Sequence, residues 1–146
     1  MPTYTVTAAE GCLAAEQKQC IAAEITRVHN MVTGAPAYFA QVLFVDVRPG
    51  NYFVGGAPLR GDQVFVHGQI RAGRTDADKH RLLTGLAEAV GQAAQMTGNS
   101  IWVYLVDLPA RQMIEFGHVL PEPGQEAAWT NALPAGDRER MERTGR

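Results

Sequence analysis

Two short apolar runs in this chain resemble each other, VLFVDV at residues 42–47 and VYLVDL at residues 103–108, 61 positions apart. The same offset aligns TYTV (3–6) with VFVH (64–67), and both segments are strand-like in composition. It also aligns two apolar triplets with the i, i+1, i+4 spacing of a helix face, namely Ile21, Ala22 and Ile25 with Leu82, Leu83 and Leu86. The pattern predicts two copies of a strand–helix–strand unit.

Each copy contributes three predicted elements. The first has a strand near residues 3–7, a helix near 13–31 and a strand near 40–47; the second has a strand near 63–70, a helix near 76–95 and a strand near 100–108. Thr75 and Asp76 are typical of a helix start. Spans of about twenty residues between strands suit parallel, right-handed crossovers. We expect an α/β fold, one domain over residues 1–146, whose two pseudo-symmetric β-α-β units span about 2–48 and 62–109 and form a four-stranded sheet with both helices on one face.

The other face of such a sheet is apolar and uncovered, which predicts self-association. Between the two copies, GNYFVGGAPLRGD predicts a short hairpin and loop. After the second copy, RQMIEFGHVLPEPG predicts a short strand or turn. The C-terminal tail spans about residues 121–146, and its polar last stretch, ALPAGDRERMERTGR, is expected to be a short helix or a frayed end without a function.

Composition narrows the class of protein. The chain is 46% hydrophobic and 19% charged, and its net charge of −2 gives no basic stripe for nucleic acid. No apolar run approaches the length of a membrane span, and no signal peptide is recognisable. Cys12 and Cys20 are too few for a disulfide framework and have no zinc-ligand spacing, and no HxH or HExxH motif is present. We therefore expect a cytoplasmic protein with reduced thiols, no metal site, and no nucleic-acid or membrane partner.

The first candidate for chemistry is Pro2, because a small second residue allows Met1 to be removed. The ring nitrogen would then be a free secondary amine, and α-amino groups titrate near pKa ~8, within reach of neutrality. The alternative is that Pro2 only begins a strand, where its missing N–H does no harm.

RAGR places Arg71 and Arg74 three residues apart at the end of a strand and the start of a helix. Two guanidinium groups this close repel each other unless an anion lies between them, and arginine suits bidentate carboxylate binding. The alternative is two solvated surface arginines. The strand that ends in Arg71 matches the strand that follows Pro2, so the two can lie side by side.

Three further side chains have both a functional and a structural interpretation. Glu115 in MIEFG has apolar neighbours, which favours a partly buried general base, or else an edge strand with the carboxylate in water. Tyr104 in IWVYLVD is a phenol in a central strand, where a packed core tyrosine is the alternative. His29 in RVHN ends the first helix, where an imidazole can serve the helix C-terminus alone.

In combination, MPTYTV, RVHN, RAGR, WVY and MIEFG, in that order across two β-α-β units, resemble the tautomerase superfamily and, within it, the cis-3-chloroacrylic acid dehalogenase family. The resemblance runs from Pro2 to about Leu133. It implies a homotrimer in which the uncovered sheet faces pack around the threefold axis.

The resemblance also implies a role for each candidate. Pro2 would act on C2 of the substrate, Arg71 and Arg74 would bind its carboxylate, and His29 would assist that binding. Tyr104, reaching over from a neighbouring subunit, and Glu115 would position and activate water.

The implied enzyme needs no metal or cofactor and takes a small carboxylate substrate. In one interpretation it is a hydratase or hydrolytic dehalogenase that converts 3-haloacrylates to malonate semialdehyde, with promiscuous phenylpyruvate tautomerase activity alongside. In a second it is primarily a keto–enol tautomerase of 2-oxo acids, and in a third a non-enzymatic binding protein on the same scaffold. Phe116 departs from the tyrosine common in the family, and the loop over residues 32–41 has no confident match.

Overall fold

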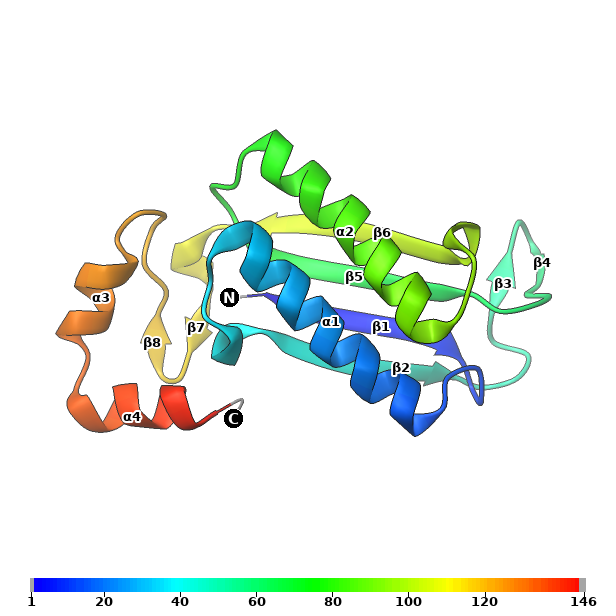
Figure 1. Cartoon of the computed structure of the whole chain (residues 1–146), viewed down its shortest axis with the longest axis horizontal. Coiled ribbons are helices and arrows are strands. Elements are labelled where there is room, and N and C mark those ends of the chain that lie inside the picture. The colour runs from blue at the N-terminus through cyan, green and yellow to red at the C-terminus, as the bar shows by residue number, and fades with distance from the viewer. Residues whose placement is uncertain (1, 145–146) are drawn as a thin grey trace.

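The computed structural model describes residues 2–144, so the expected removal of Met1 lies outside the described residues. One four-stranded sheet has the order β2-β1-β5-β6. Its strands are β1 (Thr3–Ala9), β2 (Gln41–Val47), β5 (Val64–Arg71) and β6 (Ile101–Leu108). The helices α1 (Ala15–Thr33) and α2 (Asp76–Ala94) lie side by side on one face of this sheet (Figure 1). The expected fold is confirmed.

The sheet has the pseudo-twofold arrangement that the repeat predicts. β1 pairs with β2 and β5 pairs with β6 in parallel, whereas β1 and β5 run antiparallel at the centre, with Val6 opposite Val66. The first strands of the two units begin at Thr3 and Val64, and their helices begin at Ala15 and Asp76. Both pairs of starting residues are 61 positions apart, as in the sequence repeat. The strand that follows Pro2 is therefore the direct neighbour of the strand that ends in Arg71.

Alternating burial along the central strands separates two faces. Tyr4, Val6 and Ala8 point into the main core beneath the helices, together with residues such as Ile21, Ile25, Leu82 and Leu86. At the start of α2, Thr75 caps the helix by accepting a hydrogen bond from the Asp78 backbone N–H at 3.1 Å. The predicted core faces and the cap are confirmed.

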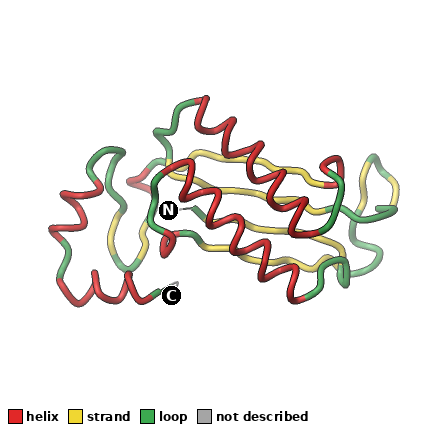
Figure 2. Tube along the Cα trace, in the orientation of Figure 1, coloured by secondary structure: helices red, strands yellow, loops and turns green. Residues whose placement is uncertain are grey.

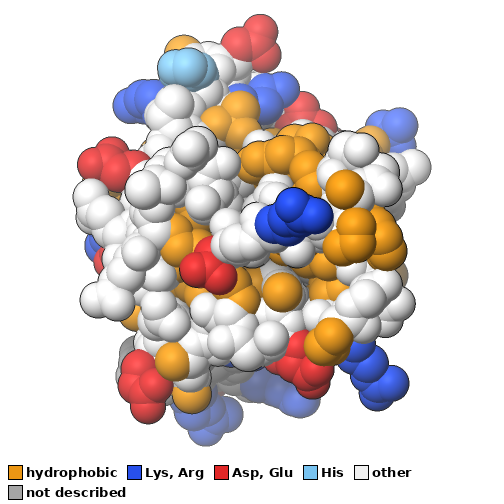
Figure 3. Space-filling view, turned by 90° about the vertical axis from the view of Figure 1, so that its right-hand side faces the viewer, with side chains coloured by type: hydrophobic (Ala, Val, Ile, Leu, Met, Phe, Trp, Pro, Cys, Tyr) orange, Lys and Arg blue, Asp and Glu red, His pale blue; other side chains and the backbone are white. Residues whose placement is uncertain are grey.

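The opposite sheet face is uncovered in the single chain. It exposes large apolar side chains from both edge strands, namely Leu43, Val45, Trp102, Tyr104 and Val106. At the end of the molecule near this face, β3 (Phe53–Val54) and β4 (Ala57–Pro58) form the hairpin expected between the two copies. Figure 3 shows hydrophobic side chains gathered at this end, where Phe53 and Val54 are exposed.

The C-terminal segment contains the short strands and the short helix expected from the sequence, and the structure adds a second helix and a small core that the sequence did not predict. Residues after β6 form η3 (Ala110–Gln112), the hairpin of β7 (Ile114–Glu115) and β8 (His118–Val119), and the helices α3 (Glu126–Ala132) and α4 (Ala135–Arg143). A second small core holds them together, with Leu120, Leu133 and Met141 buried against Phe39. The polar composition hid these few apolar anchors, because a short helix needs only one or two buried side chains to dock.

Figure 2 shows this C-terminal unit at the end of the sheet where β1 begins. Its elements approach the loop that carries η1 (Ala37–Phe39), whose Phe39 belongs to the second core. Within residues 2–144, no helix is long and apolar enough to cross a membrane.

Candidate active site

The start of β1 brings Pro2 to the edge of the sheet where the C-terminal unit docks. Pro2 is buried, and its carbonyl oxygen accepts a hydrogen bond from the Gln41 backbone N–H at 3.0 Å. In the antiparallel register Thr3 lies opposite Gln69, so Pro2, one residue earlier in the chain, lies beside the end of β5. Pro2 and the RAGR segment therefore lie at the same end of the two central strands, as the repeat predicts.

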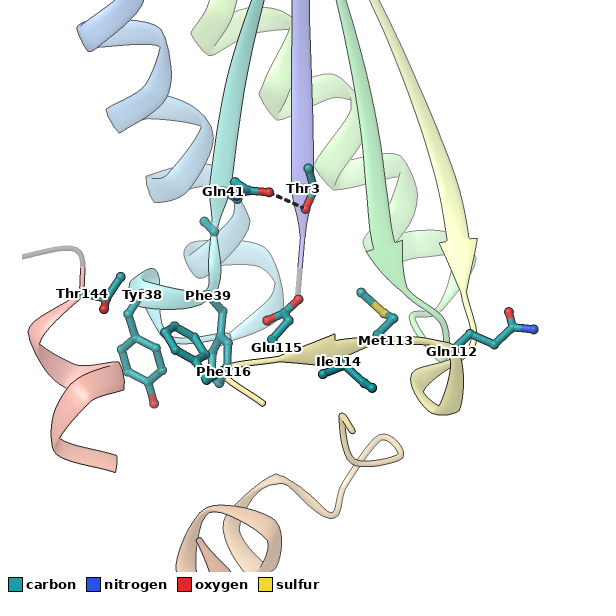
Figure 4. A pocket seen from close by; sticks show the side chains of 11 residues that line it. Thr3, Tyr38, Phe39, Gln41, Gln112, Met113, Ile114, Glu115, Phe116 and Thr144 are labelled. Carbon is teal, nitrogen blue, oxygen red and sulfur yellow. Dashed lines mark hydrogen bonds between the residues drawn. The ribbon is translucent and has the colours of Figure 1, made fainter. Parts of the chain in front are cut away.

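Glu115 approaches the same edge from the β7–β8 hairpin. Its half-buried side chain extends from β7 toward the start of β1 (Figure 4). It lines a cavity of about 640 Å³ with Thr3, Gln41 and Tyr38. The next two residues, Phe116 at φ 52° and Gly117 at φ 85°, form the tight turn of the hairpin. The structure thus places Glu115 beside the start of β1.

Phe116 occupies a left-handed conformation that a bulky residue rarely adopts. Its ring packs edge-on against Phe39, with the ring centroids 6.1 Å apart. This contact anchors the turn in the second core and so fixes the direction in which Glu115 leaves the hairpin.

His29, near the end of α1, is buried at 3% exposure rather than serving as a surface helix cap. Its Nδ1 shares a hydrogen bond with the Tyr4 hydroxyl at 2.8 Å. Burial, followed by the positive charges of Arg74 and the amino terminus, lowers the pKa of His29 to about 4. At neutral pH the imidazole is therefore uncharged. The positive charges of Arg74 and of the amino terminus are close enough to affect its pKa.

Arg71 is almost completely buried, at 4% exposure. It donates to the Pro121 carbonyl oxygen at 2.9 Å and forms an ion pair with Glu126 from α3, while its Nε has no hydrogen-bond partner among residues 2–144. Gly73 permits this packing, because at φ 102° an added Cβ would lie 2.3 Å from Pro123 Cγ. The anion that two adjacent arginines require is thus supplied in part by the chain itself.

Arg74 is half-buried and has more hydrogen-bonding capacity to spare, since its one hydrogen bond within the described residues goes to the Thr33 carbonyl oxygen at 3.1 Å. Burial, followed by the charge of Arg71, lowers the pKa of Arg74, while Glu126 and Asp78 oppose that change. Arg74 lines a cavity of about 300 Å³ together with Arg71, Glu126 and Trp129.

The loop over residues 32–41 lies between the two cavities. Tyr38 and Phe39 line both of them, so η1 separates the arginine side from the Glu115 side. The sequence motifs provided no match for this loop. In the structure it forms part of the wall of each cavity.

Tyr104 is not brought to this edge within the chain. It lies on the uncovered sheet face at 56% exposure, opposite His67 of β5 and edge-on to Phe65. It lines a separate cavity with Phe53, Val54 and Trp102 at the β3–β4 end.

Two residues of the site were missed by sequence reasoning. Tyr4 is the partner of His29, although 25 residues separate them, and Glu126 is the partner of Arg71 across 55 residues. The alternation of β1 pointed Tyr4 toward the helices and was a usable signal for it. The sequence contains no comparable signal for Glu126.

Chemically, this end of the sheet combines Pro2, a neutral imidazole, two guanidinium groups and a carboxylate that lines the neighbouring cavity. Such a set can bind an organic anion and move a proton on it. Among residues 2–144, no cluster of three or more His, Cys, Asp or Glu side chains is suited to hold a metal ion.

The two β-α-β units, with Pro2 directly before the first central strand, define the class of fold, and the comparisons with known proteins agree. A family model described as "Putative oxalocrotonate tautomerase enzyme" matches residues 1–132, so the chain belongs to this family of the tautomerase superfamily. A comparison with curated proteins found no match.

Comparison with solved structures identifies the family within this superfamily. It shares 32% identity and a TM-score of 0.92 with N1, a member of the cis-3-chloroacrylic acid dehalogenase family, over 96% of this chain and 98% of that one. Native Ps01740 is 34% identical with a TM-score of 0.72, over 77% and 99%. A wild-type fused 4-OT, F6, described as an asymmetric trimer, is 26% identical with a TM-score of 0.74, over 80% of this chain and 94% of that one. The chain thus belongs to the cis-3-chloroacrylic acid dehalogenase family.

Proposed function

We propose that this protein is a cofactor-independent enzyme whose amino-terminal Pro2 exchanges a proton with a small carboxylate substrate. Its proposed reaction is the hydration or hydrolytic dehalogenation of 3-haloacrylate-type acids to malonate semialdehyde. The observation that carries this proposal is that Pro2, His29, the RAGR arginines and Glu115 lie at the same end of the sheet. The arginines and Glu115 line two adjacent cavities that share Tyr38 and Phe39 in their walls. Similarity to N1 over nearly the whole chain supports it.

In the proposed reaction Arg74 binds the substrate carboxylate and draws electron density toward it, while Arg71, paired with Glu126, forms part of the wall of the same cavity. This polarisation makes C3 electrophilic. Glu115 takes a proton from a water molecule as the water oxygen bonds to C3, and the π electrons move toward C2 and the carboxylate. Protonated Pro2 then delivers its proton to C2. The halohydrin loses its hydroxyl proton and its halide together, which gives the aldehyde.

A second candidate function is keto–enol tautomerisation of 2-oxo acids such as phenylpyruvate, with neutral Pro2 as the base. It is favoured by the cationic surroundings, since the charge of Arg74 already lowers the pKa of His29 and would lower that of the proline amine as well. An NMR pH titration of mature, ¹⁵N-proline-labelled protein separates the two roles. A Pro2 pKa above neutrality supports the acid role, and one below neutrality supports the base role.

We further propose that the enzyme is a homotrimer. The apolar sheet face requires a cover, and Tyr104 on this face has no route to Glu115 within one chain. Assembly through this face would bring Tyr104 to the site of a neighbouring copy, where it would hold the attacking water.

The direct test compares turnover of cis-3-chloroacrylate and of phenylenolpyruvate by the mature protein and by Arg74→Ala. Both substrates carry a carboxylate, so loss of the anion ligand should lower kcat/KM for each by about 10²-fold or more. Arg27→Ala, which removes an exposed arginine paired with Glu24, is the control and should leave both rates unchanged. Retained turnover of either substrate by Arg74→Ala would contradict the anion-binding role. Full turnover by Pro2→Ala would favour the third interpretation, a binding protein without catalysis.

A further inference from the structure

Three charged side chains line the arginine-side cavity, as far as the described residues define it. Arg71 and Arg74 contribute two positive charges, and Glu126 contributes one negative charge. Asp78 also acts on Arg74, but Asp78 forms its own ion pair with Arg81 at 2.5 Å. His29 adds no charge at neutral pH, because its pKa is lowered to about 4.

Glu126 is held ionised by its partner. Partial burial raises its pKa, but the hydrogen bond and charge of Arg71 and the backbone donors outweigh this effect and leave the pKa below its ordinary value. Arg71 is almost fully buried, and its two described hydrogen bonds go to Pro121 and Glu126. The pair therefore forms part of the cavity wall.

Charge balance at the cavity follows from this pair. With Glu126 on Arg71, the cavity presents one uncompensated positive charge, on Arg74. One substrate carboxylate neutralises it. A second carboxylate in the same small cavity would lie near Glu126, and the described side chains that line the cavity offer it no further cation. An unpaired charge in a partly desolvated site is costly.

Resting on the proposed function, we propose that Glu126 is a specificity-determining residue that restricts the site to monocarboxylates by neutralising Arg71. Glu126 touches Arg71 and lines the cavity, so it acts on substrate choice through the electrostatic field and not on the reacting carbon atoms. The neighbouring Trp129 and Thr130 of α3 form the wall beside it.

The test measures binding of two matched probes, acrylate and maleate, which differ by one carboxylate, to the mature protein by isothermal titration calorimetry. The key variant is Glu126→Gln, because the amide keeps the shape and an oxygen acceptor for Arg71 while removing the charge. Glu122→Gln is the matched control, since it removes the same charge from an exposed position four residues earlier.

We expect the wild type to prefer acrylate, and Glu126→Gln to shift the maleate-to-acrylate affinity ratio by about tenfold toward maleate, the change expected when one nearby charge is removed. Glu122→Gln should leave that ratio unchanged. The kcat/KM ratio for mono- and dicarboxylate substrates should move in the same direction.

An unchanged ratio in Glu126→Gln would overturn the inference while the proposed function stands. Equal tightening of both probes would also overturn it, because Glu126 would then be a plug in the anion site and not a selector. Absence of acrylate binding and of all turnover in the wild type would overturn the proposed function and the inference with it.

Discussion

His29 and Glu115 show how the tertiary environment assigns different tasks to single residues of similar polarity. His29 is enclosed beneath the sheet edge and hydrogen-bonded to Tyr4, so its charged form is disfavoured. Glu115 stands on a hairpin turn beside a cavity wide enough for water and a small substrate. The imidazole is thereby suited to form hydrogen bonds while uncharged, and the carboxylate is suited to accept a proton.

His29 should make stability depend on pH. Its folded pKa of about 4 lies below the ordinary 6.5, so the unfolded chain binds the extra proton first as pH falls. The free energy of unfolding should therefore be at its full value above pH 6.5 and decline by up to about 3 kcal/mol as pH falls to 4. Urea denaturation at a series of pH values measures this, and His29→Gln should remove much of the decline.

The exposed His80 provides the control, because His80→Gln changes the same residue type without disturbing the core. A decline in His29→Gln as steep as in the wild type would show that another group causes it.

Glu115→Gln should separate the two candidate reactions. Only hydration needs an activated water molecule, so halide release from 3-chloroacrylate should fall by about 10²–10⁴-fold, the typical contribution of a general base. Ketonisation of phenylenolpyruvate should change by less than about tenfold, because it uses Pro2 for proton transfer. Steady-state kinetics on both substrates check this, and equal losses would assign Glu115 a role shared by both reactions.

At the scale of elements, the C-terminal unit packs against the loop over residues 32–41, which lines both cavities. Phe39 of η1 packs with residues of η3, of the segment after β8 and of α4 in the second core. Because Tyr38 and Phe39 line both cavities, the position of α3 and α4 helps to set the shape of each cavity. A stretch of polar composition therefore contributes to the site through a few buried contacts.

Met141→Ala should reveal this connection. Met141 is buried to 1% exposure in the second core, so truncation should lower the free energy of unfolding, or of local opening of α4, by about 2–5 kcal/mol. Hydrogen exchange of α4 together with urea denaturation measures it. Met31→Ala, at a methionine with 65% exposure, is the control and should change stability by less than about 0.5 kcal/mol. Similar effects of the two substitutions would mean that the second core contributes little.

At the scale of the whole molecule, the single chain leaves one sheet face unfinished. Apolar side chains of β2 and β6 remain exposed there, and Tyr104 stands among them. Closed assembly of identical chains is the common way to cover such a face, and it can place a residue of one chain in the site of the next. The active unit proposed for this protein is accordingly larger than one chain.

Subunit complementation tests this directly. Tyr104→Phe and Glu115→Gln should each be poor dehalogenases alone. When the two variants are unfolded, mixed and refolded together, about one site in four should combine Glu115 of one chain with Tyr104 of another, if chains assemble at random. Halide release should recover accordingly. Refolding each variant alone is the control, and no recovery in the mixture would contradict a shared site.

Much of the fold was predictable from local patterns. The alternation of β1 and the helix-face triplets are local signals, and the 61-residue offset shows that the same local pattern occurs twice. A sheet covered on one side preserves both patterns. Even the adjacency of the Pro2 and Arg71 strands followed from pseudo-symmetry. The docking of the C-terminal helices was not predictable in this way, because it rests on isolated side chains such as Leu133 and Met141.

The sequence by itself thus determined the repeated β-α-β units, the uncovered sheet face and the set of candidate side chains, because periodicity and motif spacing are properties of neighbouring residues. Only the tertiary structure decided the partners: Tyr4 for His29, Glu126 for Arg71, and η1 as the wall between two cavities. These are contacts between segments far apart in the chain, and burial together with charge compensation selects them only when the whole molecule has packed.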